Sequence, residues 1–222
     1  MASSVQETPE DLKARLKASY DAIAPEYNAW TVKNSEFRVV YLDKLLPLLP
    51  KENATVLELG CGAGVPVIER LLATPGIAAV TANDLSSAQI ALGKEKLGTD
   101  RITWVESDMM SLDFPAASFD AVLGFYSVIH LPREEQTQLL AKIVEWLKPG
   151  GHILINFSAE AMDAAINEKW LHEKGWMFWS GWGADTSLEQ VRKAGLEVVV
   201  GEVTKDHVDA SFLWVIAKKS VV

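Results

Sequence analysis

Short apolar runs alternate with amphipathic stretches through the middle of the chain. The runs have the length and composition of strands and lie at residues 55–59, 79–83, 102–106 and 119–125. The stretches between them place apolar residues at helical spacing, over residues 67–72, 86–97 and 133–147. Strands and helices in this order predict crossover connections and a mainly parallel sheet covered on both faces.

The segments that flank this alternating core differ from it. Before it, a helix is predicted to begin near Thr8 and another to cover residues 35–46, so that residues 1–50 form a helical cap. After it, the pattern predicts a fifth strand, two helices and a closing antiparallel hairpin, at residues 152–157, 159–170, 186–194, and 196–203 with 212–217. The predicted fold class is α/β, a doubly wound sheet of seven strands in a single domain of residues 1–222.

Composition limits the partners of the chain. It has 222 residues and a formal net charge of −9, which disfavours a nucleic-acid partner. Its single cysteine, Cys61, permits no internal disulfide and no cysteine-rich metal site, and it favours a reducing compartment. The first residues do not resemble a signal peptide, and no apolar run reaches the roughly 18 residues that span a bilayer. We therefore expect a cytoplasmic protein with no metal, no membrane partner and no nucleic-acid partner.

A glycine-rich loop follows the first strand and leads into the next helix. It reads ELGCGAG over residues 58–64, and its glycines allow a tight turn and a close approach of the backbone to a ligand. A dinucleotide-binding loop has its third glycine one residue later, where this chain has Val65. Glu58 would also repel a pyrophosphate. S-adenosylmethionine, which has no phosphate and carries a positive charge, suits this loop better.

With four further segments, this loop resembles the class I S-adenosylmethionine-dependent methyltransferases that act on small molecules. The segments are Asp84 after the second strand, Ser107-Asp108-Met109 after the third, Phe119-Asp120 opening the fourth, and residues 147–151 before the fifth. The resemblance implies a Rossmann-like fold, with a cofactor-binding core over residues 51–157 and a substrate-side insertion plus hairpin over residues 158–222.

The resemblance also implies the cofactor contacts. Asp84 would accept hydrogen bonds from both ribose hydroxyls, Asp108 would accept from the adenine amine, and Met109 would cover the adenine ring. A tyrosine of the N-terminal cap, Tyr20 or Tyr27, would lie over the cofactor. The implied cofactor-binding residues are Tyr20, Glu58, Gly60, Cys61, Gly62, Gly64, Asp84, Leu85, Asp108, Met109 and Phe125.

The methyl acceptor is expected to be a small molecule, methylated on O, N or S by in-line displacement that leaves S-adenosyl-L-homocysteine. After the fourth strand the chain reads GFYS, not the Asn/Asp-Pro-Pro-aromatic motif of enzymes that methylate DNA bases. His130 is the candidate general base because imidazole titrates near neutrality, and a purely structural histidine is the alternative. The candidate acceptor-binding residues are Tyr27, Tyr126, Trp176, Trp179 and His207, whose predominance of aromatic rings favours an aromatic or cationic acceptor.

Two other functions remain open at this point. A nucleotide-dependent oxidoreductase would use a similar sheet, although Glu58 and the early Gly64 argue against it. A catalytically silent methyltransferase-like domain would bind the cofactor, never consume it, and regulate a partner. The sequence leaves the oligomeric state open between a monomer and a homodimer.

Overall fold

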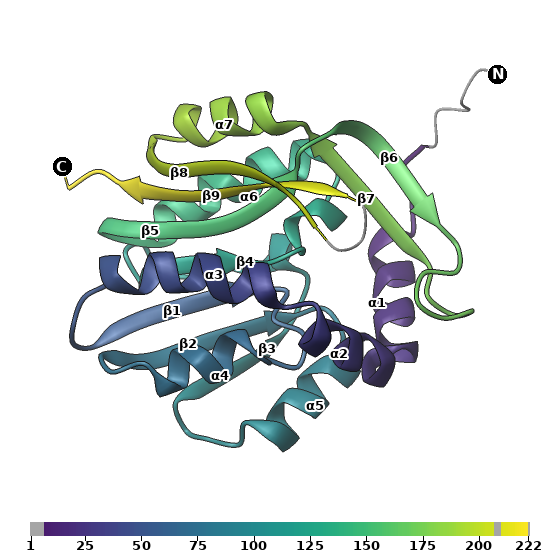
Figure 1. Ribbon diagram of the computed structural model, residues 1–222, viewed down its shortest axis with the longest axis horizontal. Helices are drawn as coiled ribbons and strands as arrows, with labels where there is room; N and C mark the ends of the chain where they lie inside the picture. The colour runs from purple at the N-terminus through teal and green to yellow at the C-terminus, as the bar shows by residue number, and fades with distance from the viewer. Residues whose placement is uncertain (1–6, 207–209, 222) are drawn as a thin grey trace.

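The computed structural model describes residues 7–206 and 210–221, and its centre is a seven-stranded sheet (Figure 1). The strand order is β3-β2-β1-β4-β5-β9-β8. The strands are β1 Ala54–Leu59, β2 Ile77–Asp84, β3 Ile102–Glu106, β4 Phe119–Gly124, β5 Leu147–Ser158, β8 Leu196–Lys205 and β9 Ser211–Lys219. The first five pair in parallel, and β9 pairs antiparallel with both β5 and β8. The predicted fold class is confirmed.

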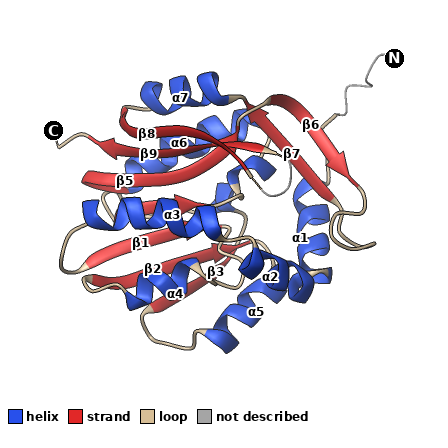
Figure 2. Cartoon of the chain, viewed as in Figure 1, coloured by secondary structure: helices blue, strands red, loops and turns tan. Residues whose placement is uncertain are grey.

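Helices cover both faces of this sheet (Figure 2). One layer contains α3 Glu36–Leu45, α4 Val67–Ala73 and α5 Ser87–Lys96, and the other contains α6 Arg133–Trp146 and α7 Ala184–Lys193. Successive strand residues point to opposite faces. In β1, Val56 therefore packs into the apolar cluster under α3, α4 and α5, whereas Leu57 packs into the cluster under α6 and α7. None of the helices in the described ranges combines the length and apolar composition needed to cross a bilayer.

A third group of elements lies at the right-hand side of Figure 1, beyond the carboxyl ends of the parallel strands. It consists of α1 Leu12–Ala22, α2 Ala24–Lys33 and an antiparallel pair of strands, β6 Ala161–Asn167 and β7 Met177–Trp182. Leu12 and Leu16 of α1 pack against Met177 and Phe178 of β7 in a separate apolar cluster. The N-terminal helices and the β6–β7 pair thus form one wall facing the sheet edge.

The helix predicted over residues 159–170 is wrong. Residues 161–167 form β6, whose register with β7 runs from Ala161 opposite Trp182 to Asn167 opposite Met177. Alanine is the best helix former, but helix propensity is a weak preference, and pairing with the aromatic-rich strand β7 outweighs it here. The helix α2 lies where the sequence predicted only an unspecified cap, and a proline occupies its first turn, where proline is tolerated.

Candidate active site

The glycine loop turns sharply as β1 ends. Gly60, Gly62 and Gly64 have φ angles of 69°, 56° and 75°, in the left-handed region. A Cβ atom at Gly60 would lie 2.3 Å from Cβ of Ser127, so only glycine fits there. The thiol of Cys61 is buried, which raises its pKa, and it donates to the carbonyl of Gly62 at 3.3 Å. Cys61 is therefore a protonated, internally bonded thiol and no nucleophile.

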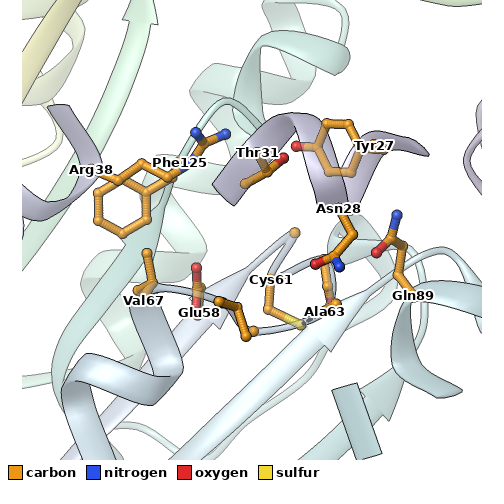
Figure 3. A pocket seen from close by; sticks show the side chains of 14 residues that line it. Tyr27, Asn28, Thr31, Arg38, Glu58, Cys61, Ala63, Val67, Gln89 and Phe125 are labelled. Carbon is orange, nitrogen blue, oxygen red and sulfur yellow. Dashed lines mark hydrogen bonds between the residues drawn. The ribbon is translucent and has the colours of Figure 1, made fainter. Parts of the chain in front are cut away.

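Glu58 and Arg38 line a small cavity in front of this loop, which we call the loop cavity (Figure 3). Their side chains are only 2% and 4% exposed. Oε2 of Glu58 has no hydrogen-bond partner among the described residues. Burial raises the pKa of Glu58 well above its ordinary value, and the nearby Arg38 opposes this rise. A buried carboxyl group and a buried guanidinium cation in one cavity suit a ligand that carries both an ammonium and a carboxylate group.

Asp84 connects the glycine loop to α5. Its Oδ2 accepts from the amide of Gly62 and its Oδ1 from the amide of Ser86, both at 2.8 Å. Ser86 in turn caps α5 by accepting from the amide of Gln89, as the sequence predicted. Burial raises the pKa of Asp84 from 3.8 to about 6, against the effect of its hydrogen bonds. The two carboxylate oxygens can accept more hydrogen bonds than the backbone amides supply, so Asp84 can also accept from hydroxyl groups.

A second cavity, of about 70 Å³, extends along the carboxyl ends of β1, β2 and β3, and we call it the strand-end cavity. Asp84 and Asp108 supply carboxylates to its lining, and Leu85, Met109 and Phe125 supply apolar surface. Oδ1 of Asp108 accepts from the amide two residues later at 3.0 Å, which fixes the carboxylate. The cavity thus offers acceptors and an apolar surface to a flat ring that carries an amine.

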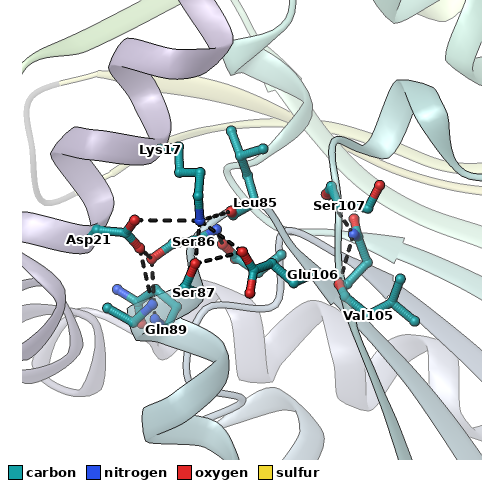
Figure 4. A network of polar contacts seen from close by, with 12 residues as sticks. Lys17, Asp21, Leu85, Ser86, Ser87, Gln89, Val105, Glu106 and Ser107 are labelled. Carbon is teal, nitrogen blue, oxygen red and sulfur yellow. Dashed lines mark hydrogen bonds and ion pairs between the residues drawn. The ribbon is translucent and has the colours of Figure 1, made fainter.

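Charged side chains fasten α1 over the strand-end cavity (Figure 4). Nζ of Lys17 lies 2.9 Å from a carboxylate oxygen of Glu106 and 3.4 Å from one of Asp21. It also donates to the carbonyl of Leu85 at 3.1 Å. Asp21 accepts from the hydroxyl of Ser86 at 2.6 Å. The Lys17–Asp21 pair lies within α1, and the other bonds join α1 to β3 and to the start of α5 next to Asp84.

A second lysine extends this clamp. Lys13, one turn before Lys17, lies 2.6 Å from a carboxylate oxygen of Glu135 and 3.4 Å from Oδ1 of Asp108. The N-terminal helix therefore contacts the very carboxylate predicted to accept from adenine.

A third cavity, of about 390 Å³, lies between α2, the β6–β7 pair and the start of β9. We call it the aromatic cavity. Its rings pack against one another: Trp30 and Trp170 meet edge-on at 5.5 Å, and Trp170 and Trp179 at 6.0 Å. The aromatic side chains of its lining are Tyr20, Tyr27, Trp30, Tyr126, Trp170, Trp179 and Phe212, beside His130. The polar ones are Arg38, Ser158, Glu160, Asn167 and Ser211.

Four residues line both the strand-end cavity and the aromatic cavity, and we call them the junction residues. They are Tyr20, Tyr27, Tyr126 and His130. Tyr126 has a left-handed φ of 55°, and its hydroxyl donates to Asp206 at 2.6 Å. A strained non-glycine backbone of this kind persists only where the surroundings hold it, often at functional sites.

His130 is hydrogen-bonded at both ring nitrogens. Nδ1 lies 2.7 Å from the carbonyl oxygen of Phe178 and must donate to it, because a carbonyl only accepts. Nε2 therefore accepts from the hydroxyl of Tyr20, at 2.8 Å. Burial lowers the pKa of His130 from 6.5 to about 4 and raises the pKa of Tyr20 well above its ordinary value. At neutral pH the pair is a neutral imidazole and a neutral phenol.

Comparison with known proteins finds a family match for the central part of the chain. Residues 56–151 match the family described as the methyltransferase domain, and this range contains the glycine loop, Asp84, Asp108 and His130. This part of the chain is thus similar to a methyltransferase domain. The match agrees with the S-adenosylmethionine-dependent methyltransferases that the sequence resembles, and one of the similar solved structures holds S-adenosylhomocysteine.

Curated relatives match this chain over part of their length. Sterol 24-C-methyltransferase of Pneumocystis carinii is 33% identical over 103 residues, which are 46% of this chain and 27% of that protein. The first curated relatives are covered to between 26% and 42% of their own length.

Two solved structures share the fold along nearly the whole chain. The Burkholderia thailandensis 1,6-didemethyltoxoflavin-N1-methyltransferase, solved with its acceptor and S-adenosylhomocysteine, has a TM-score of 0.73 and 20% identity, covering 99% of this chain and 93% of that one. The [4+2]-cyclase SpnF has a TM-score of 0.73 and 19% identity, covering 99% and 100%. At these identities the likeness shows the fold alone.

Most of the predicted site residues line at least one of the three cavities. Trp176 is the exception: it lines none of the three, and its ring packs in the α1–β7 cluster, 4.1 Å below the Arg15 guanidinium. His207 lies outside the described residues. Within the described ranges, no group of His, Cys, Asp or Glu side chains is arranged to hold a metal ion.

Sequence reasoning missed Arg38, Trp30 and Trp170. Arg38 lines both the loop cavity and the aromatic cavity, and the two tryptophans form the aromatic wall. An unpaired acidic residue in a glycine loop indicates that a cationic side chain lies nearby. The sequence contains several arginines, and no local pattern shows which of them lies next to Glu58.

Proposed function

We propose that this chain transfers a methyl group from S-adenosylmethionine to an O, N or S atom of a small, largely planar acceptor bound in the aromatic cavity. The observation that carries the proposal is the set of junction residues. Because they line both cavities, a cofactor in one and an acceptor in the other would meet at the same four side chains. Holding the two reactants in this way is the main requirement of an in-line methyl transfer.

The cofactor half of the proposal rests on unsatisfied polar groups. Glu58 would accept from the ammonium group of the cofactor, and Arg38 would donate to its carboxylate. Asp84 would accept from the ribose hydroxyls and Asp108 from the adenine amine. Gln89 lines the same cavities, and neither polar atom of its side-chain amide has a hydrogen-bond partner among the described residues.

The acceptor half rests on the lining of the aromatic cavity. Its aromatic faces favour a flat or cationic molecule, and Ser158, Asn167 and Glu160 would orient polar substituents. A cavity of about 390 Å³ falls within the usual range for small-molecule sites. Among the similar proteins, one is named as a sterol 24-C-methyltransferase and another as an N1-methyltransferase of 1,6-didemethyltoxoflavin, so both carbon and nitrogen are methylated atoms in these names.

Calorimetric titration tests the cofactor half. S-adenosylmethionine and S-adenosylhomocysteine are expected to bind, whereas NAD is not. Asp84→Ala is expected to abolish binding, and Asp43→Ala, which removes an exposed carboxylate paired with Arg70, to leave it intact. Binding of NAD alone, or of none of the three, would reject the proposal. Formation of S-adenosylhomocysteine with planar phenols and aromatic amines then tests transfer.

A second candidate is a binding domain that holds the cofactor without consuming it. The fold likeness to a cyclase over 99% of this chain supports keeping this candidate, because the same fold serves a protein named for another reaction. The two candidates separate on one measurement. A protein that binds S-adenosylmethionine but forms no S-adenosylhomocysteine with any acceptor favours the second.

A further inference from the structure

A chain of hydrogen bonds crosses the junction between the two cavities. The hydroxyl of Tyr20 donates to Nε2 of His130, and Nδ1 of His130 donates to the carbonyl of Phe178. The three groups come from α1, from the 3-10 turn Val128–His130 and from β7. Elements that are distant in the sequence are thus brought together to hold one phenol and one imidazole.

The direction of these bonds restricts what His130 can do by itself. Its Nε2 lone pair already receives the proton of Tyr20, and its Nδ1 proton is held by a backbone carbonyl. A molecule in the aromatic cavity therefore meets a histidine with no free lone pair. Tyr20, by contrast, keeps lone pairs on its oxygen, which donates only once.

We propose that Tyr20 and His130 form a proton relay, in which the oxygen of Tyr20 takes the proton of the methyl acceptor while its own proton passes to Nε2 of His130. The inference rests on the proposed methyl transfer and assigns Tyr20 as the group that touches the acceptor. His130 is the proton's destination, and the Phe178 carbonyl fixes its tautomer.

The step is balanced as follows. A lone pair of the acceptor's N–H or O–H group forms the bond to the methyl carbon, and the carbon–sulfur bond breaks with its electron pair going to sulfur. The acceptor's proton moves to Tyr20, the Tyr20 proton moves to His130, and the products are a neutral thioether, a neutral methylated acceptor and an imidazolium.

The lowered pKa of His130, about 4, suits a temporary proton carrier. The imidazole is neutral across the physiological pH range and can therefore accept a proton. Alkylation makes the acceptor's proton far more acidic, so a weak base suffices to take it, and the imidazolium then releases it readily. The titratable or charged residues that line the two cavities around the pair are Lys13, Tyr27, Arg38, Asp84, Asp108, Tyr126 and Glu160.

The relay also defines the acceptor more narrowly. An acceptor with a hydrogen on its nucleophilic atom needs a group to receive that proton, whereas a tertiary amine or a thioether does not. The substrate class that this arrangement fits is a planar phenol or an aromatic or heteroaromatic N–H compound.

Kinetics with naphthol and aminoquinoline as acceptors test the relay. Tyr20→Phe and His130→Ala are each expected to lower kcat about 100-fold, with the S-adenosylhomocysteine Kd nearly unchanged, and the double variant to be no slower than either single one. Matched controls are Tyr41→Phe, which loses a hydroxyl bonded to Glu202 outside the cavities, and His152→Gln in β5. Wild-type turnover that survives Tyr20→Phe, or multiplicative losses in the double variant, overturns the relay.

Nitrogen NMR on protein with isotope-labelled histidines tests the same bonds without an acceptor. In the S-adenosylhomocysteine complex we expect a neutral His130 protonated at Nδ1 at neutral pH, with an Nε2 signal that moves in Tyr20→Phe and not in Tyr41→Phe. A cationic ring or the opposite tautomer overturns the relay. Absence of turnover from every acceptor in a wild-type protein with the expected spectrum instead contradicts the proposed methyl transfer.

Discussion

The guanidinium of Arg38 lies 4.2 Å from the centre of the Tyr126 ring, at the boundary between the loop cavity and the aromatic cavity. One of its nitrogens donates to the carbonyl of Asn34 at 3.1 Å, which leaves other N–H groups of the fork for a ligand. The position of Arg38 is thus fixed by an aromatic face and a carbonyl before any ligand binds.

We expect Arg38→Met to weaken binding of S-adenosylmethionine. A hydrogen bond to a charged group contributes about 1.5–3 kcal/mol, so the Kd is expected to rise about 10- to 150-fold. Calorimetry measures the change, and Arg70→Met, which removes an exposed arginine paired with Asp43, is the control. Equal affinities for the two variants would show that Arg38 does not contact the cofactor.

Cofactor affinity is expected to depend on the protonation of Asp84. Its pKa is raised by burial to about 6, so the carboxylate that accepts from hydroxyls is lost as the pH falls through that value. The affinity should be constant above about pH 7 and fall up to about tenfold per pH unit below pH 6. Titrations at several pH values measure this, and a flat profile in the wild-type protein speaks against the contact.

The same group affects stability in the opposite sense when no cofactor is bound. A carboxyl whose folded pKa is raised favours the folded state when it is protonated. Its contribution is therefore lost as the pH rises from 3.8 to about 6. The difference in melting temperature between the protein with and without S-adenosylhomocysteine should therefore be largest above this pH range, where Asp84 is ionised.

Loosening the clamp on α1 is expected to speed release of the cofactor. Lys17→Met removes the ion pair with Glu106 that joins α1 to β3, and a partly exposed pair contributes about 0.2–1 kcal/mol. The dissociation rate of S-adenosylhomocysteine should rise by up to about fivefold in stopped-flow experiments. Lys193→Met, which breaks an exposed pair with Glu189 on α7, is the control. A slower or unchanged rate for Lys17→Met would contradict the clamp.

The aromatic wall is expected to affect the acceptor and not the cofactor. Trp170→Ala removes a ring that contacts both Trp30 and Trp179, so the acceptor KM should rise about tenfold while the S-adenosylmethionine Kd stays the same. Trp176→Phe, at a ring packed below Arg15, should leave both constants near the wild-type values. A higher acceptor KM in Trp176→Phe would show that Trp176 belongs to the acceptor site.

The central sheet was predictable because its signals are local. A strand buried on both faces reads as an apolar run, and the predicted range 119–125 contains β4, in which every residue is buried. Ser86 was predictable as a cap for the same reason, since the side chain bonds to an amide of its own helix turn. The glycine loop and Asp84 follow directly from strand ends, which the sequence marks.

The acceptor side was not predictable because its elements depend on distant partners. The segment at residues 161–167 becomes a strand only because β7 pairs with it. Trp176 and Trp179 belong to one aromatic run, yet one packs against α1 and the other lines the aromatic cavity. Arg38 is matched to Glu58 only by the path of α3 across the sheet, which no local pattern records.

Helix α1 carries both Lys17, which fastens it to the core, and Tyr20, which is bonded to His130. Any movement of α1 that uncovers the strand-end cavity also separates the phenol from the imidazole. If the proposed cofactor enters and leaves by such a movement, the proposed proton relay is assembled only while the cofactor is enclosed. The helix that closes the cavity would then also set the order of the two events, enclosure first and proton transfer afterwards.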